Sequence, residues 1–236
     1  MLLIYFKNNN MSNLILVRHG QSVWNLENRF TGWVDVDLSE NGKEEAKKAG
    51  ILIKDQNLKI DFFYSSLQLR ANNTLKIIKT SLNDKSNFIA AWQLNERHYG
   101  ALTGLNKIET TKKLGEDKVF EFRRSWDLRP APLSKDSPYH PKNIKIYEKI
   151  PKKQIPDTES LKDTYERVLK YFNEEIKEKL LSKNVLISAH GNSIRALCKF
   201  LFKLDNKRIS ELEIPTGNPL LIKFRNNLKI SECKYL

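Results

Sequence analysis

One short pattern occurs twice in this chain of 236 residues: an apolar run that ends in His-Gly-x-Ser. The first copy spans residues 14–22 and places His19 after its apolar run, and the second spans residues 185–193 and places His190 at the same point. Each apolar run has the length and composition of a buried β-strand. Because the carboxyl ends of the strands in an open α/β sheet face one crevice, the two histidines can meet there.

The residues that follow the two histidines favour the binding of an anion. Ser22 and Ser193 each stand where a helix could begin, and the first turn of a helix presents unpaired amide donors. A phosphate would fit between these two helix starts. An imidazole can also act as a nucleophile near neutral pH, because much of it is unprotonated at a reference pKa of about 6.5.

Apolar runs alternate with helical patterns along the whole chain. Strands are predicted at residues 14–17, 62–65, 88–91, 185–189, 220–224 and 229–232, of which the first four have the composition of buried strands. Helices are predicted at residues 39–54, 66–82 and 159–181, the last being the longest. This alternation predicts an α/β fold of three layers, α/β/α, with a mainly parallel central sheet. Residues 127–157 hold six of the eight prolines and are predicted to form an excursion over the surface.

The length and the 40% hydrophobic content fit one sizeable core, so we expect a single domain over residues 12–236. Residues 1–11 are expected to be a disordered extension or the product of a misassigned start, because Met11 stands directly before the first strand. The apolar run at residues 1–6 is too short for a signal segment or a membrane span, which predicts a cytoplasmic protein with no membrane partner. The two cysteines are expected to be reduced and structural.

The net charge of +13 could indicate a nucleic acid or an acidic membrane surface as the partner. The lysines, however, are dispersed among acidic residues along the helical patterns at residues 43–54 and 162–183, which is typical of a solvated surface. We therefore expect no nucleic-acid partner. A non-catalytic anion-binding or nucleic-acid-binding protein is the alternative from another functional class, and binding alone gives no reason for the two His-Gly motifs.

A smaller set of polar residues is not dispersed in this way. Arg18 precedes the first histidine, and Arg70 heads the helix predicted after the second strand. Taken singly, such residues have ordinary explanations: a histidine after a strand is usually structural, and an arginine or glutamate on a helix is usually a surface charge. The chain also carries Ser22-x-x-Asn25, Phe30-Thr31-Gly32-Trp33, Leu94-Asn95-Glu96-Arg97-His98-Tyr99-Gly100, Gly104-Leu105-Asn106-Lys107, Arg123-Arg124, Glu159-Ser160-Leu161, Ala189-His190-Gly191-Asn192-Ser193 and Ile214-Pro215-Thr216-Gly217.

Together these motifs closely resemble those of the cofactor-dependent phosphoglycerate mutases of the histidine phosphatase superfamily, over nearly the whole chain. The Arg18-His19-Gly20 motif alone would imply only the superfamily. The block at residues 96–100, Lys107 and the arginine doublet point to the mutase branch.

The resemblance implies a catalytic set of His19, Glu96, His190, Arg18 and Arg70. His19 would be the nucleophile that becomes a phosphohistidine, and Glu96 would be the general acid and base. Arg18 and Arg70 would bind the non-bridging oxygens of the transferring group, which His190 would also stabilise. The substrate-binding positions would be Arg18, Ser22, Asn25, Thr31, Gly32, Arg70, Glu96, Arg97, Tyr99, Lys107, Arg123, Arg124, Gly191 and Asn192.

The activity that the resemblance implies is the interconversion of 2-phosphoglycerate and 3-phosphoglycerate, primed by 2,3-bisphosphoglycerate. The alternative within the superfamily is a phosphatase of small phosphate monoesters, which would not need Lys107, Arg123 and Arg124. No group of His, Asp and Glu has metal-ligand spacing, so metal-free chemistry is expected. A homodimer and a homotetramer are both compatible with the sequence.

Two expectations concern water exclusion and the remaining histidines. Mutases of this family often continue past the last strand into a mobile tail, whereas this chain stops at Leu236. We therefore expect measurable bisphosphatase activity, with residues 127–157 as the candidate lid. His98 has no predicted role, and His140 is predicted to lie on the surface.

Overall fold

The computed structural model describes residues 11–225 and 227–236, so the predicted N-terminal extension lies outside the described residues except for Met11. The strands are β1 (Ser12–Arg18), β2 (Phe62–Ser65), β3 (Ile89–Ala90), β4 (Val185–Ala189), β5 (Pro219–Arg225) and β6 (Lys229–Tyr235). The α-helices are α1 (Val23–Leu26), α2 (Glu40–Lys54), α3 (Leu69–Ser81), α4 (Lys107–Leu114), α5 (Glu116–Arg124), α6 (Leu161–Tyr171), α7 (Gly191–Leu201) and α8 (Asn206–Glu211).

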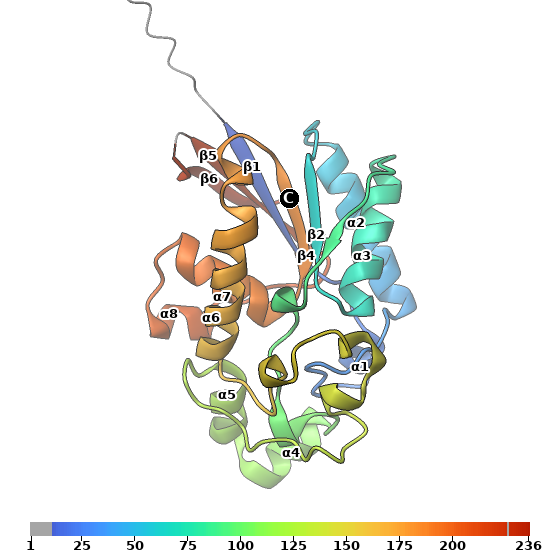
Figure 1. The fold of residues 1–236 in the computed structure, drawn as a ribbon, viewed down its shortest axis with the longest axis vertical. Coiled ribbons are helices and arrows are strands. Elements are labelled where there is room, and N and C mark those ends of the chain that lie inside the picture. The colour runs from blue at the N-terminus through green and yellow to red at the C-terminus, as the bar shows by residue number, and fades with distance from the viewer. Residues whose placement is uncertain (1–10, 226) are drawn as a thin grey trace, which may run out of the picture.

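The six strands form one sheet in the order β3-β2-β4-β1-β5-β6. Strands β1 to β4 pair in parallel, whereas β5 and β6 run antiparallel to their neighbours. Helices α2 and α3 cover one face of this sheet, and α6 and α7 cover the other (Figure 1). The predicted three-layer α/β/α fold with a mainly parallel sheet is confirmed.

The central strands are apolar on both faces because helices cover both faces. Along β1, Leu14 and Leu16 pack in the core with α6 and α7, whereas Ile15 and Val17 pack in the core with α2 and α3. All four side chains are buried. This continuous apolar run made β1 recognisable from the sequence.

The parallel strands β1, β2 and β4 end at one edge of the sheet, where the site forms. Arg18 lies opposite Ala189 in the register of β1 and β4, and the amide of His19 donates to the Ala189 carbonyl at 3.0 Å. Helices α4 and α5 lie beyond this edge (Figure 1). The chain segments that enclose the cavity therefore come from widely separated parts of the sequence.

Two glycines allow α2 to approach the turn that follows β1. A Cβ atom on Gly42 would lie 2.0 Å from the carbonyl oxygen of Gln21, and one on Gly20 would lie 2.1 Å from the carbonyl oxygen of Gly42. The amide of Gly20 also donates to the hydroxyl of Thr74 on α3, at 3.0 Å. These contacts fix the backbone next to His19 between two helices.

Two secondary-structure predictions were wrong in part. The third strand is two residues long rather than four, and Ile89 and Ala90 are exposed rather than buried, because β3 is an edge strand with one partner. The predicted helix over residues 159–181 is interrupted. Helix α6 is followed by a π-helical turn at Phe172–Ile176 and a 3-10 turn at Lys179–Leu181, so α2 is longer than α6.

The π-helical turn keeps the buried stripe of this segment facing the core. The buried positions Val168, Phe172, Ile176 and Leu180 follow one another at every fourth residue. Four residues advance an α-helix by about 40° more than a full turn, so a stripe with this spacing drifts around a regular helix. A wider turn reduces that drift. The apolar spacing was visible in the sequence, but its departure from a regular helix was not recognised.

Residues 127–157 are attached to the rest of the molecule by a buried anchor. The segment contains short 3-10 turns, and Leu133 and Asp157 close its base through a backbone hydrogen bond of 2.9 Å. The buried Tyr147 hydroxyl donates to the Trp33 carbonyl at 2.5 Å, and Ile150 packs against the same tryptophan. Movement of this segment as a lid would require these contacts to break.

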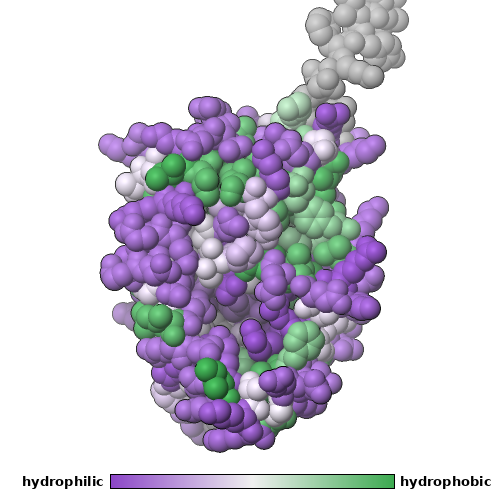
Figure 2. Space-filling model, turned by 180° about the vertical axis from the view of Figure 1, so that it is seen from behind, coloured by the Kyte–Doolittle hydropathy of each residue, from purple (hydrophilic) through white to green (hydrophobic). Residues whose placement is uncertain are grey.

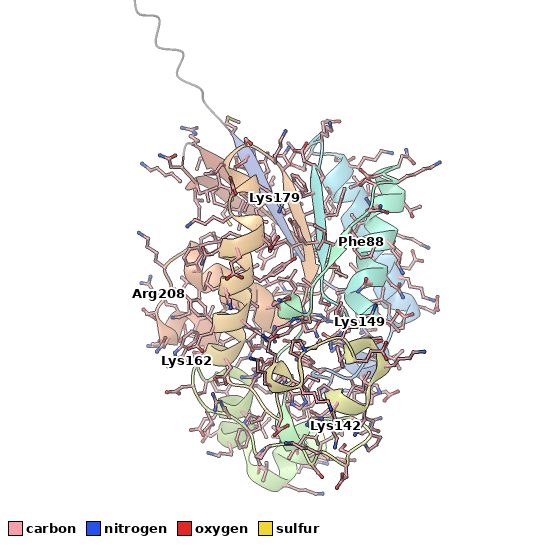
Figure 3. The ribbon with its side chains drawn as sticks, in the orientation of Figure 1. Phe88, Lys142, Lys149, Lys162, Lys179 and Arg208 are labelled. Atoms are coloured by element: carbon pink, nitrogen blue, oxygen red, sulfur yellow. The ribbon has the colours of Figure 1, made fainter. Side chains whose placement is uncertain are left out.

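Charged residues are spread over the outside of the molecule. Figure 2 shows hydrophilic side chains over most of one face, with smaller hydrophobic areas between them. Figure 3 labels Lys162 on α6, Arg208 on α8 and Lys149 in the connection between two 3-10 turns, so the cations come from separate parts of the chain. Across residues 11–225 and 227–236, no helix combines the length and the apolar character that crossing a membrane requires.

Candidate active site

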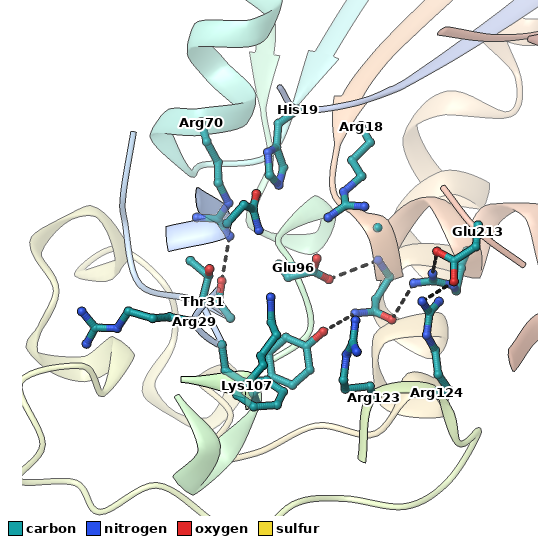
Figure 4. A pocket seen from close by; sticks show the side chains of 17 residues that line it. Arg18, His19, Arg29, Thr31, Arg70, Glu96, Lys107, Arg123, Arg124 and Glu213 are labelled. Atoms are coloured by element: carbon teal, nitrogen blue, oxygen red, sulfur yellow. Dashed lines mark hydrogen bonds and ion pairs between the residues drawn. The ribbon is translucent and has the colours of Figure 1, made fainter. Parts of the chain in front are cut away.

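The carboxyl edge of the sheet opens into a cavity of about 120 Å³ (Figure 4). Its lining includes seven cationic side chains and two carboxylates. The lining residues are Arg18, His19, Asn25, Arg29, Phe30, Thr31, Gly32, Arg70, Glu96, Tyr99, Lys107, Arg123, Arg124, Gly191, Asn192, Arg195 and Glu213. The excess of positive charge and the polar lining make this a cavity for a small anion.

His19 directs one ring nitrogen toward the protein backbone. Its Nδ1 lies 2.7 Å from the carbonyl oxygen of Gly20, and a carbonyl can only accept, so Nδ1 carries the proton and Nε2 carries the lone pair. Burial, followed by the charges of Arg70 and Arg18, lowers the pKa of His19 well below its ordinary value. The imidazole is therefore neutral at pH 7 and has a nucleophilic nitrogen available.

His190 packs edge-on against His19, with ring centroids 4.9 Å apart. Its Nε2 lies 2.8 Å from the Ser66 hydroxyl, which already accepts a hydrogen bond from the Gln68 amide. The Ser66 hydroxyl can donate to Nε2, and in that tautomer the His190 proton lies on Nδ1. Among the described residues Nδ1 has no hydrogen-bond partner. Burial lowers the pKa of His190 well below its ordinary value, so this ring is also neutral.

Two arginines flank the histidines from different elements. Arg18, at the end of β1, donates from Nη1 to the carbonyl of Ile214 at 2.7 Å. Arg70, in the first turn of α3 as predicted, donates to the carbonyls of Val34 and Gly32 at 2.9 and 2.8 Å. Burial lowers the pKa of Arg70. The backbone contacts hold both guanidinium groups in fixed positions beside His19.

Hydrogen bonds hold Glu96 at its main-chain amide and at its side-chain carboxylate. Its amide donates to the side chain of Gln68 at 3.0 Å. Its Oε1 accepts from the amides of Arg97 at 2.8 Å and Asn192 at 3.2 Å. Oε1 thus bridges the loop after the third strand to the first turn of α7. The carboxyl group is oriented by main-chain amides, which do not themselves take up or release protons.

A buried ion pair lies behind the Glu96 loop. Arg167 and Glu159 pair at 2.6 Å, and both side chains are largely buried. Arg167 also donates to the carbonyl of Glu96 at 2.9 Å, and Glu159 accepts from the amide of His98 at 2.8 Å. The pair therefore fixes the loop on either side of Arg97. Glu159 was part of a recognised motif, whereas Arg167 on α6 was not singled out.

The side chains of Tyr99, Asn192 and Arg195 form a chain of hydrogen bonds along the cavity. The side-chain amide of Asn192 donates to the Tyr99 hydroxyl at 3.1 Å and accepts from Arg195 at 3.3 Å. Burial opposes ionisation of Tyr99, but the charge of Arg97 and the other nearby cations outweighs it, so its pKa is lowered. The Tyr99 hydroxyl is therefore polarised toward donating a hydrogen bond.

Helices α4 and α5 bring the remaining cations. Lys107 is the first residue of α4, which Asn106 caps by accepting from two backbone amides. Arg123 and Arg124 lie in the last turn of α5, where the helix dipole favours cations. Burial lowers the pKa of Lys107 and of Arg124. These side chains face the cavity from the side opposite the sheet (Figure 4).

Most residues that the sequence predicted for the site line this one cavity. Exceptions are Ser22, Arg97 and His190, which are not among the residues that line it. Ser22 caps α1 in a reciprocal capping box with Asn25, and Arg97 lies under the ring of Tyr99 at 4.7 Å. The helix at the second motif begins at Gly191 rather than at Ser193. The roles of these residues remain predictions.

Four lining residues were not found from the sequence: Arg29, Phe30, Arg195 and Glu213. Phe30 belonged to a quoted motif, but an aromatic residue alone does not indicate a polar cavity. Arg195 lies within α7 and resembles an ordinary helix cation until its burial is known. Glu213 reaches the cavity only because the loop after α8 passes beside α5 and α7.

The prediction that His140 lies on the surface was wrong. His140 is 1% exposed, and its Nε2 lies 2.8 Å from a carboxylate oxygen of Asp157. Its ring lies 6.3 Å from that of His98. The proline-rich segment folds back over this histidine, which the sequence did not reveal.

Within the described part of the chain, no group of three or more His, Cys, Asp or Glu residues could hold a metal ion.

Comparisons with known proteins agree with this geometry. The model of the histidine phosphatase superfamily (branch 1) matches residues 14–140 and 134–230. The 2,3-bisphosphoglycerate-dependent phosphoglycerate mutase of Pelagibacter ubique (strain HTCC1062) is 67% identical over 227 residues, which cover 96% of this chain and 95% of that protein. The chain belongs to the phosphoglycerate mutase family of the histidine phosphatase superfamily. The protein of the same name in Borreliella burgdorferi (strain ZS7) is 48% identical, covering 96% of this chain and 92% of its own length.

Solved structures share the fold of this member of the mutase family. A protein titled Bacillus stearothermophilus YhfR matches with a TM-score of 0.69 and 20% identity, over 93% of this chain and 94% of its own. A mycobacterial glucosyl-3-phosphoglycerate phosphatase complexed with VO3 matches with a TM-score of 0.66 and 21% identity, over 89% and 92%. At these identities the likeness concerns the fold alone.

The buried histidines predict that acid destabilises this phosphoglycerate mutase family member. Burial lowers the pKa of His98 from 6.5 to about 3, so below pH 6.5 the unfolded chain takes up a proton that the folded chain does not. The free energy of unfolding should therefore fall by about 1.4 kcal/mol per pH unit for this residue as pH falls from 6.5 toward 4. His98→Asn should lack this contribution, because asparagine does not titrate. The variant should still fold, because the side-chain oxygen of asparagine can accept from the Gly100 amide as the His98 ring does.

Urea unfolding of the parent and of His98→Asn at pH 7.5, 6.0 and 5.0 measures this difference. The parent should lose more stability than the variant at each step toward acid. Parallel decreases in the two proteins would show that His98 is not kept neutral by the fold.

Proposed function

We propose that this chain interconverts 2-phosphoglycerate and 3-phosphoglycerate through a phosphohistidine at His19 that is primed by 2,3-bisphosphoglycerate. The observation that carries this proposal is the available Nε2 of His19 at the edge of a cavity lined by seven cations. The 67% identity to a protein named for this activity supports it. As part of the same proposal, the enzyme acts in glycolysis and gluconeogenesis in the cytoplasm.

His19 performs the transfer by in-line displacement. Its Nε2 lone pair forms the bond to phosphorus while the bond from phosphorus to the leaving oxygen breaks. In the return step the P–N bond breaks and its electron pair goes back to Nε2. Arg18 and Arg70 bind the non-bridging oxygens, and the His190 Nδ1–H donates to the same group, which stabilises the charge that develops there.

Glu96 moves the proton that each transfer requires. When a substrate hydroxyl attacks the phosphohistidine, Glu96 accepts the hydroxyl proton, and it returns a proton to the leaving oxygen in the opposite direction. The main-chain amides of Arg97 and Asn192 orient its carboxylate, and Arg167 holds the backbone of its loop. One carboxyl group in a fixed place can therefore serve both directions of the reaction.

The charge of the cavity suits 2,3-bisphosphoglycerate, which supplies the first phosphoryl group to His19. Its two phosphates and one carboxylate carry about four to five negative charges near pH 7. The lining offers five more cations than carboxylates. Among the described residues, buried nitrogens of the lining residues Arg18 and Arg124 have no hydrogen-bond partner, as expected for donors to an anion. Lys107, Arg123 and Arg124 would bind the groups remote from His19.

A phosphatase reaction on small monoesters is the alternative for the same nucleophile, with water accepting the phosphoryl group. The remote cations argue against it, because a small monoester would leave Lys107, Arg123 and Arg124 without an anionic partner. The phosphatase among the structural neighbours is too distant in sequence to decide the reaction.

A coupled assay of 3-phosphoglycerate conversion tests the proposed function. The protein should form 2-phosphoglycerate, and catalytic amounts of 2,3-bisphosphoglycerate should raise the rate by phosphorylating His19. An enolase-coupled absorbance change measures the product, and a phosphate assay run in parallel measures hydrolysis. Release of inorganic phosphate without formation of 2-phosphoglycerate would identify a phosphatase instead.

Glu96→Gln should lower turnover by about 10²- to 10⁴-fold, because an amide keeps the oxygen that accepts from Arg97 and Asn192 but cannot shuttle a proton. The thermal unfolding midpoint should stay close to that of the parent, since the hydrogen bonds to the backbone amides remain possible. Turnover at the level of the parent would remove Glu96 from the proton transfer.

Lys107→Ala should raise the KM for 3-phosphoglycerate by about 10- to 100-fold, because a charge-assisted hydrogen bond to a remote anionic group is lost. Hydrolysis of a small aryl phosphate, which lacks that group, should change much less. Lys112→Ala, an exposed lysine on the same helix, is the matched control and should behave as the parent. Equal losses on both substrates would indicate general damage to the cavity.

A further inference from the structure

Glu213 is a carboxylate at the edge of a cavity that the proposed function assigns to an anion. It pairs with Arg124 and lies 3.7 Å from the guanidinium of Arg195. Figure 4 shows it beside Arg124 and away from His19, so it takes no part in the transfer step. Arg124 thus already has an anionic partner before any ligand binds, although one of its buried nitrogens remains without a hydrogen bond among the described residues.

The backbone that carries Glu213 is fixed, whereas its side chain is free to turn into solvent. Arg195 donates from Nε to the Leu212 carbonyl at 2.8 Å, and Arg18 donates to the Ile214 carbonyl at 2.7 Å. The hydroxyl of Tyr235 also lies 3.4 Å from the Glu213 carbonyl. The side chain of Glu213 is 71% exposed, while that of Arg124 is only 12% exposed. The carboxylate can therefore leave Arg124 without any change in the loop.

We propose that Glu213 is a resident anion that competes with the remote anionic group of the substrate for Arg124 and thereby weakens phosphoglycerate binding. This inference rests on the proposed function, which places that group near Arg124. When a ligand binds, its remote anionic group either displaces the Glu213 carboxylate from Arg124 or is repelled by it, and both lower the affinity. Affinity at this end of the cavity is lower than seven cations alone would give, which allows a bound bisphosphate to detach from Arg124 and reorient.

Glu213→Gln tests the competition, because it removes the charge and keeps the size of the side chain. The dissociation constant for 2,3-bisphosphoglycerate, measured by calorimetry, and the KM for 3-phosphoglycerate should both fall by about three- to tenfold at low ionic strength. The gain should shrink in high salt, since the carboxylate is exposed. Glu211→Gln is the matched control: it makes the same charge change two residues earlier, at an exposed position outside the cavity lining, and should leave both constants as in the parent.

The same substitution in an Arg124→Ala background locates the effect. The gain from Glu213→Gln should be smaller there, because the arginine for which the carboxylate competes is gone. An undiminished gain would assign the effect to the overall charge of the cavity and overturn the competition. Weaker binding in Glu213→Gln would show that the carboxylate orients Arg124 for the substrate, and unchanged binding would show that it has no influence. Either result would overturn the competition.

The outcome for the parent protein separates this inference from the proposed function. A parent that binds 2,3-bisphosphoglycerate and forms 2-phosphoglycerate, together with a Glu213→Gln variant that binds no more tightly, overturns only the role of Glu213. A parent that neither binds the bisphosphate nor converts 3-phosphoglycerate overturns both.

Discussion

The parallel pairing of β1 with β4 is the interaction on which the rest of the site depends. Its register sets Arg18 opposite Ala189, and the amide of His19 extends the pairing to the Ala189 carbonyl. A slip of one residue would turn every apolar side chain of β1 to the other face, so the cores on both faces of the sheet hold the register. The two imidazoles are therefore brought to 4.9 Å by packing that lies outside the cavity.

The second constraint is that the fold must hold many cations around one cavity before a ligand arrives. Burial lowers the pKa of Arg70, Lys107 and Arg124, because a charged group loses hydration when it is buried. Backbone carbonyls and two carboxylates satisfy part of the positive charge. An anionic ligand satisfies more of it, so substrate binding and stability of the folded state are linked. Of the two carboxylates, Glu213 pairs with Arg124, whereas Glu96 accepts from the main-chain amides of Arg97 and Asn192.

The sequence predicted those parts of the fold and site that are set by local patterns. Strand β4 and the helix start near Arg70 could be predicted because apolar runs and helix starts are local signals. Glu96 and Lys107 could be assigned only through the family resemblance, since neither residue differs locally from a surface charge. Glu213 and the buried His140 could not be predicted, because their surroundings come from loops whose paths depend on tertiary contacts.

Labelling with 2,3-bisphosphoglycerate that bears radioactive phosphate tests whether His19 carries the phosphoryl group. A phosphohistidine survives base and hydrolyses in acid, so the label on the protein should be stable in base and labile in acid. Addition of unlabelled 3-phosphoglycerate should remove the label as 2,3-bisphosphoglycerate and 2-phosphoglycerate. His19→Ala should take up no label. A stable label of normal stoichiometry on folded His19→Ala would show that the nucleophile is another residue.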